Sequence, residues 1–170
     1  MTERGGPVVR PATSTDLPAL TAIYNHYVAH TPITFDVVPV DLENRAAWMS
    51  HYAGSGPHRL LVAVADEVVV GYATSSRFRE RTAYATSVET SVYCRHDCTG
   101  RGIGSQLYAA LFDALEGVDV HRAYAGTTLP NDASVALHRH FGFSEIGVFR
   151  QVGRKFGRYW DVLWMEKALS

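Results

Sequence analysis

The period of the hydropathy pattern changes between residues 84 and 115, and three alternate glycines mark the change. Residues 84–94 alternate strictly between two sets of side chains, which predicts a strand with two different faces. Across residues 103–115 apolar side chains recur at helical spacing, and Gly117 ends that pattern. A strand that passes through a glycine turn directly into an amphipathic helix is expected in a domain of mixed α/β architecture.

Shorter elements are expected on both sides of this unit. The other predicted strands cover residues 8–10, 60–65, 68–74, 122–128, 143–152 and 158–166. Helices are expected between Thr13 and Pro32, over residues 41–52, and from Asn131 to His140. This order predicts an α/β layer structure around a mixed, mostly antiparallel sheet flanked by helices, with antiparallel pairing in the first half of the sheet.

The composition fits one domain that needs neither metal nor disulfides. A chain of 170 residues can bury a sufficient core, so we expect a single domain over residues 8–170 after a flexible N-terminus, residues 1–7. The 16 basic and 17 acidic residues nearly balance, which argues against a nucleic-acid partner. Cys94 and Cys98 lack the spacing of a metal site, and no bound metal is expected.

Neither a secretory signal nor a membrane span is expected. The first ten residues contain no apolar segment of the kind found in a signal peptide. The most apolar stretch, residues 60–73, is interrupted by Asp66 and Glu67 and cannot cross a bilayer. We therefore expect a cytoplasmic protein with reduced thiols and no membrane partner.

The glycine turn is the strongest indication of chemistry. Gly100, Gly102 and Gly104 let the backbone approach a ligand closely, and free N–H groups at the start of the next helix attract an anion such as phosphate. A plain turn without a ligand is the alternative. A dinucleotide site of Rossmann type is disfavoured, because the turn follows the fourth strand and the next strand ends in Thr127-Thr128 rather than an acid.

Two further side chains are candidates for catalysis. Glu89 lies in the middle of a strand, where a carboxylate is unfavourable, and its small neighbours on the same face would leave a cleft beside it. His138 lies on a helix among apolar side chains. The alternatives are a solvent-facing glutamate and a partly exposed histidine. His26 and His30 have ligand spacing without a third ligand, so both are expected to be structural, and the remaining histidines are not expected to cluster.

Several segments together resemble one known family. The glycine turn at residues 100–104, the segment Leu-Pro-Asn-Asp-Ala-Ser-Val-Ala-Leu-His at 129–138 and Phe-Gly-Phe at 141–143 resemble the GNAT N-acetyltransferase superfamily. Within it, Glu-Thr-Ser-Val-Tyr at 89–93 and Val-Gly-Arg-Lys-Phe-Gly at 152–157 are similar to the group of phosphinothricin and methionine sulfoximine/sulfone acetyltransferases. The resemblance covers nearly the whole chain and implies the single-domain GNAT fold.

The resemblance also implies acetyl-CoA as co-substrate and assigns residues to it. The pyrophosphate would lie on the turn formed by Gly100, Arg101, Gly102, Ile103, Gly104 and Ser105. The backbone of Val92, Tyr93 and Cys94 would pair with the pantetheine arm like an added strand, and Asn131 would contact the same arm. Thr99 stands where the family usually has Arg or Gln, a departure that would loosen the grip but leaves the N–H groups in place.

Glu89 and His138 match the catalytic pair of the family. Glu89 is the expected general base, and His138 would share that role or assist the departing thiolate. We expect direct transfer in a ternary complex without an acetyl-enzyme, because neither cysteine has an assigned base.

The acceptor implied by the resemblance is a small amino acid with a tetrahedral head group, such as phosphinothricin or methionine sulfoximine. Arg79 and Arg81 would bind its anionic or sulfoxide-like groups, although a solvated basic loop is the alternative. Phe35 and Tyr84 would form the pocket walls, and Thr74 with Arg79 would be among the positions that decide the head group.

The group also implies a homodimer, with part of its interface from the last strand, which carries Tyr159, Trp160 and Trp164. Two other functions remain open from the sequence. One is acetylation of a different amine, such as a peptide or polyamine, and the other is a non-catalytic sensor that binds acyl-CoA.

Overall fold

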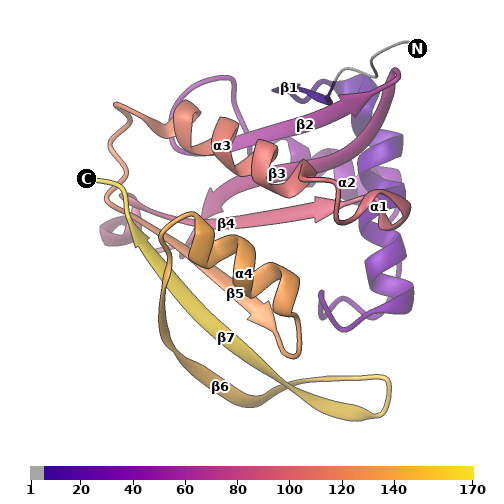
Figure 1. Ribbon diagram of the computed structural model, residues 1–170, viewed down its shortest axis with the longest axis vertical. Helices are drawn as coiled ribbons and strands as arrows, with labels where there is room; N and C mark the ends of the chain where they lie inside the picture. The colour runs from indigo at the N-terminus through magenta and orange to yellow at the C-terminus, as the bar shows by residue number, and fades with distance from the viewer. Residues whose placement is uncertain (1–5) are drawn as a thin grey trace.

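A seven-stranded sheet with helices on both faces forms the molecule (Figure 1), and the computed structural model describes residues 6–170. The flexible N-terminus expected over residues 1–7 therefore lies mostly outside the described residues. The strands are β1 (Val8–Pro11), β2 (Arg59–Ala65), β3 (Val68–Arg77), β4 (Ser87–Cys94), β5 (Arg122–Thr128), β6 (Ser144–Lys155) and β7 (Arg158–Ala168). The helices are α1 (Leu17–His30), α2 (Leu42–Met49), α3 (Ile103–Leu115) and α4 (Asp132–His140).

The helix boundaries follow from local chemistry that the sequence already indicated. Helix α1 carries Pro18 in its first turn, where proline is tolerated, and the chain leaves the helix before Pro32. The side chain of Asp41 accepts the backbone N–H of Asn44 and caps α2, and the side chain of Asn131 caps α4 in the same way. No helix among residues 6–170 has the length and apolar character needed to span a membrane.

One predicted boundary was wrong, since the central strand begins at Ser87 rather than Tyr84. The segment Thr82–Tyr84 is a 3₁₀ turn, closed by the N–H of Tyr84 on the carbonyl of Arg81. Strand pairing starts only where β4 meets its neighbours, at Ser87 opposite Arg122 on β5. Tyr84 therefore belongs to the connection before the strand and not to its alternating pattern.

The sheet has the order β1-β2-β3-β4-β5-β7-β6, and only β4 and β5 pair in parallel. Antiparallel pairing was expected in the first half, but it also continues through β5, β7 and β6. The β4–β5 pairing covers only three residue pairs and ends at Glu89 opposite Tyr124. Beyond that point the two strands diverge (Figure 1), because β4 continues along β3 while β5 stays paired with β7.

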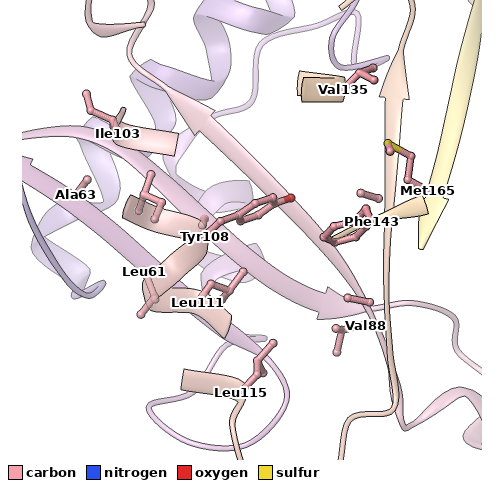
Figure 2. Packing of buried hydrophobic residues seen from close by; sticks show 14 of the residues in the cluster. Leu61, Ala63, Val88, Ile103, Tyr108, Leu111, Leu115, Val135, Phe143 and Met165 are labelled. Carbon is pink, nitrogen blue, oxygen red and sulfur yellow. The ribbon is translucent and has the colours of Figure 1, made fainter. Parts of the chain in front are cut away.

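Two hydrophobic cores, one on each face, hold the layers together. The larger core lies under α3 and α4 (Figure 2), and the smaller one packs α1 and α2 against β2 and β3. The predicted apolar stripe of α3 is buried throughout, as expected: Ile103, Leu107, Leu111 and Leu115. Each such side chain contributes roughly 1.5–3 kcal/mol when fully buried, so packing rather than helix propensity stabilises α3.

Candidate active site

A cavity of about 670 Å³ opens where β4 and β5 diverge. Its walls are the end of β4, the end of β5, the glycine turn and one face of α4. The residues predicted for the cofactor line it together: Val92, Tyr93, Cys94, Gly100, Gly102, Ile103, Gly104, Ser105 and Asn131. Arg101 is exposed and lies outside this lining. The sequence pattern thus brings together distant segments at one cavity.

The glycine turn presents uncapped backbone donors at the start of α3. Gly100 and Gly102 both have φ of 74°, a conformation that favours glycine. Gly102 is the N-cap of α3, no side chain caps this end, and no acidic residue lies in the first turn. A Cβ on Gly104 would lie 3.3 Å from Leu137 Cδ2, so glycine lets α3 approach α4 closely. Free N–H groups without a nearby carboxylate fit a phosphate-bearing ligand.

Helix α1 makes direct contacts with the segment that leads into this turn. The Tyr27 hydroxyl donates to the carbonyl of Cys94 at 2.5 Å. The ring of His26 stacks on His96, with centroids 3.9 Å apart, and lies 4.9 Å from His30. The expectation that the other histidines do not cluster was therefore wrong for His96, because the chain that follows β4 brings its ring against His26 on α1. The part of the chain that the structure describes holds no set of metal-ligating groups.

Glu89 lies at the last residue pair before the strands separate. It is partly buried, and it shares a strand face with Ser91 and is paired in register with Ser76 on β3. Burial raises the pKa of its carboxyl above the ordinary value, and the nearby positive charge of Arg79 partly opposes this increase. Glu89 itself is not part of the cavity lining, which begins at its neighbours Thr90 and Ser91. A carboxylate with a raised pKa beside a cavity is suited to accept a proton.

His138 is buried on the opposite face of the sheet from Glu89. Its Nδ1 donates to the Ser134 carbonyl at 2.7 Å, so its Nε2 accepts from the Tyr108 hydroxyl at 2.8 Å. The Tyr108 hydroxyl also lies 3.1 Å from the hydroxyl of Thr90, the β4 residue next to Glu89. Burial lowers the pKa of His138, so the ring is neutral at pH 7. His138 therefore reaches β4 through Tyr108 and Thr90 rather than by contact with Glu89.

A second cavity, of about 240 Å³, lies on the Glu89 face of the sheet. Its walls come from α1, α2, the segment between them, β3 and β4. Ser91 and Tyr93 line both cavities, so the two spaces meet at β4 just beyond Glu89. Thr74, predicted as an acceptor residue, is buried in the wall of this second cavity.

The other predicted acceptor residues lie outside the walls of these two cavities. Arg79 is exposed, with its guanidinium 4.3 Å from the Phe78 ring centroid, and its charge acts on Glu89. Tyr84 and Arg81 are exposed on the same connection. Phe78 stacks on Tyr124 and so holds this connection over β5. These three residues therefore lie on the β5 side of the second cavity.

Phe35 lies on the connection between α1 and α2, beside the β6–β7 hairpin. Its ring fills the space that a Cβ at Gly153 on β6 would occupy. Next to it, the buried ammonium of Lys155 donates to the carbonyl of Thr34 at 2.8 Å. Phe35 thus packs the connection against the hairpin, whereas the sequence had predicted Phe35 in the wall of the acceptor pocket.

Three residues of the site were not found from the sequence: Arg45, Ser91 and Tyr108. Arg45 is three residues before Trp48, a spacing that puts both on one side of α2 and could have indicated their stacking. Tyr108 follows Leu107 in the buried stripe, and a buried hydroxyl needs a partner. Ser91 is a small strand residue without a distinctive sequence signal, and only the fold shows that it lines both cavities.

Both cysteines are free in the structure. Cys94 lines the first cavity, but burial raises the pKa of its thiol to about 11. A thiol with that pKa is protonated at neutral pH and is a poor nucleophile. The geometry therefore favours an acceptor amine over Cys94 as the attacking group.

Comparison with known proteins agrees with this geometry. A family model described as an acetyltransferase (GNAT) domain matches residues 9–164. The chain is 56% identical over 163 residues to a phosphinothricin N-acetyltransferase of Streptomyces coelicolor, covering 95% of each. It is 39% identical over 162 residues to an L-methionine sulfoximine/L-methionine sulfone acetyltransferase of Pseudomonas paraeruginosa, covering 95% of this chain and 94% of that relative.

A solved structure is similar over almost the whole chain. The crystal structure of a GNAT superfamily phosphinothricin acetyltransferase from Sinorhizobium meliloti, in complex with acetyl-CoA, has a TM-score of 0.92 and 31% identity. The match covers 98% of this chain and 90% of that one. The chain therefore belongs to the GNAT family of N-acetyltransferases. The resemblance and the fold class predicted from the sequence are both confirmed.

Proposed function

We propose that this enzyme transfers the acetyl group of acetyl-CoA to the amino group of a small amino acid. The observation that carries the proposal is the meeting of two cavities at Ser91 and Tyr93, beside Glu89. One cavity has phosphate-binding geometry, and the other is small and lined by polar groups. The names of the relatives, which include phosphinothricin and methionine sulfoximine/sulfone acetyltransferases, support an acceptor of this size.

The donor side is the cavity between β4 and β5. The N–H groups from Gly100 to Ser105 would hold the pyrophosphate, while the open edge of β4 from Val92 to Cys94 would pair with the pantetheine arm. Asn131 would contact the same arm. When bound, acetyl-CoA supplies an acetyl thioester. The chain supplies orientation, and holding two reactants in place can contribute roughly 7–11 kcal/mol in favourable cases.

The acceptor side requires removal of a proton. An α-amino group with a pKa of about 8 is mostly protonated at pH 7, so the site must take up that proton. Glu89 is our general base, acting directly or through water. Arg79, whose charge already acts on Glu89, would bind the carboxylate of the amino acid, with Arg81 and Tyr84 on the same loop. Thr74 would contact the acceptor inside the second cavity.

His138 has a different place in this scheme. Both of its ring nitrogens already have partners within the protein. Its neutral Nε2 accepts from Tyr108, so His138 would position the Tyr108 hydroxyl, which lies beside the first cavity through Thr90. His138 itself lines the first cavity, whereas Tyr108 is fully buried outside that lining, so assistance to the departing thiolate from this side would come from His138.

The test is thiol release from acetyl-CoA with a panel of amino acids, in wild type and Glu89→Gln. We expect turnover with amino acids that carry an oxygenated head group, and a loss of kcat/KM of about 10²–10⁴-fold in the variant. Acetyl-CoA binding, measured by calorimetry, should be unchanged in Glu89→Gln. Turnover with peptides or polyamines alone would favour an acetyltransferase for those amines. Binding of acetyl-CoA without turnover of any amine would favour a non-catalytic sensor.

We also propose that the enzyme is a homodimer. The β6 strand forms one edge of the sheet and exposes apolar side chains, among them Ile146, Phe149 and Val152. Tyr159 on the neighbouring strand is likewise exposed. Long exposed apolar edges favour association with another chain.

A further inference from the structure

Arg45 is a buried guanidinium in the wall of the second cavity. The residue is 5% exposed, and it lies on α2 above the tyrosines of β3 and β4. Its Nη2 donates to the hydroxyl of Tyr72 at 2.7 Å. Its Nε is buried without any hydrogen-bond partner. A buried donor on a charged group without a partner is unfavourable and calls for an explanation.

Aromatic rings, and no carboxylate, surround this charge. The guanidinium carbon lies 3.4 Å from the Trp48 ring centroid and 4.4 Å from that of Tyr24. Within residues 6–170 no acidic side chain forms a salt bridge with Arg45. Asp36 lines the same cavity, but its carboxylate accepts from the Tyr24 hydroxyl at 2.6 Å. Stacking between rings fixes the guanidinium plane and leaves its edge for a ligand.

Arg45 lies over the part of β4 where the side-chain end of an acceptor amino acid would lie. Tyr72, its hydrogen-bond partner, is paired in register with Tyr93. Tyr93 is two residues beyond Ser91 on the strand face that Glu89 shares, which corresponds to about 7 Å at roughly 3.3 Å per residue. An amino group at Ser91, with Glu89 acting through a water molecule, would therefore place the head group of a small amino acid within reach of Arg45.

We propose that Arg45 binds the oxygens of the acceptor's side-chain head group and so selects sulfonyl- or phosphinyl-bearing amino acids over thioethers. This inference rests on the proposed function and adds the residue that decides the head group. The fork of a guanidinium matches two oxygens on one tetrahedral centre, which a thioether lacks. Arg79, outside the cavity, then serves the α-carboxylate.

The test compares L-methionine sulfone with L-methionine, which have the same chain and differ in the two oxygens on sulfur. We expect wild type to favour the sulfone by roughly 30-fold or more in kcat/KM, the size of a charged hydrogen bond to a ligand. Arg45→Met should reduce this preference to less than about 3-fold. Equal kcat/KM for both acceptors in wild type, or an unchanged preference in Arg45→Met, would overturn the proposal.

Matched variants separate head-group binding from a structural role. Arg79→Gln should lower kcat/KM for both acceptors by a similar factor and keep the preference. Arg45→Lys, which keeps the charge in case Arg45→Met does not fold, should retain less than half of the preference. If Arg45→Met instead abolishes the difference between methionine sulfone and its α-carboxamide, Arg45 binds the carboxylate and the proposal fails.

A binding measurement distinguishes this proposal from the proposed function. If wild type acetylates no amino acid, the proposed function fails. Calorimetry with methionine sulfone on the CoA-bound enzyme then decides: binding that disappears in Arg45→Met supports the head-group site, and binding of equal strength in both proteins overturns it.

Discussion

Glu89 combines a poor strand position with a raised pKa, and both follow from its place at the end of the β4–β5 pairing. The half-buried setting disfavours the charged form, while Arg79 restores part of its stability. A general base must be deprotonated, so a raised pKa moves the loss of activity to a higher pH than for an exposed glutamate.

We therefore predict that kcat/KM rises with pH through a group whose pKa exceeds 4.5, the ordinary value for glutamate. A second rise, above about pH 8, should come from the acceptor amine itself. In Glu89→Gln only the amine's rise should remain. The measurement is kcat/KM with one amino acid from pH 5 to 9, and an identical acid limb in the variant would contradict the prediction.

Tyr108 allows a second prediction for a single residue. Removing its hydroxyl in Tyr108→Phe leaves Nε2 of the buried His138 without a donor. We expect a loss of unfolding free energy of about 1–3 kcal/mol, measured by urea denaturation. Tyr84→Phe is the matched control, since Tyr84 is 41% exposed and its change should stay within about 0.5 kcal/mol. Equal stability of the two variants would show that the His138–Tyr108 contact contributes nothing.

At the level of elements, the start of α3 depends on backbone conformation rather than on side chains. Gly102 is the N-cap with φ of 74°, and nothing lies within 4 Å of the position of an added Cβ. A substitution there strains the backbone without a steric clash. Such strain alters the direction in which the first N–H groups of α3 point.

We expect Gly102→Ala to cost about 1–2 kcal/mol of stability and to weaken acetyl-CoA binding by roughly 10-fold or more. Calorimetric titration with acetyl-CoA measures the second effect. Gly54→Ala is the control, because Gly54 also has open space around its Cβ position but no positive φ. Unchanged affinity in Gly102→Ala would exclude a role for the turn in holding the pyrophosphate.

The helices and most strands could be predicted because period, caps and glycines act locally. Asn131 caps α4, and residues 122–128 form β5 as expected. The start of β4 was misplaced because the alternation begins at Tyr84, where a 3₁₀ turn and not a neighbouring strand satisfies the backbone. Strand pairing is a long-range property, so the pattern of one segment does not define where it begins.

The site was only partly predictable for the same reason. The glycine turn and the end of β4 have local signatures, and the fold brings most of their residues to one cavity. Arg45 comes from a helix distant in sequence, and its role depends on rings from α1 and β3 that only the fold brings to it. Arg79 and Arg81, by contrast, lie in one short segment rich in arginine, a local pattern that the sequence alone displays.

At the scale of the whole molecule, the β6 edge is the surface most suited to association. It is 12 residues long, and Ile146, Phe149 and Val152 are each more than half exposed. We predict a dimer by size-exclusion chromatography with light scattering, and a monomer for the double variant Ile146→Lys/Phe149→Lys. Val68→Lys, at an apolar side chain 45% exposed on β3 in the other half of the sheet, should remain a dimer. A monomeric wild type at tens of micromolar, roughly the range of such measurements, would contradict the prediction.

Because β4 and β5 share three residue pairs, the seven strands form two ribbons joined at a narrow seam. A donor molecule that hydrogen-bonds along the free margin of β4 bridges these ribbons and becomes part of the architecture. Ligand at 100 times its Kd adds about 2.7 kcal/mol to the native state. We therefore expect bound acetyl-CoA to raise the unfolding temperature of this enzyme and to slow its digestion by an added protease.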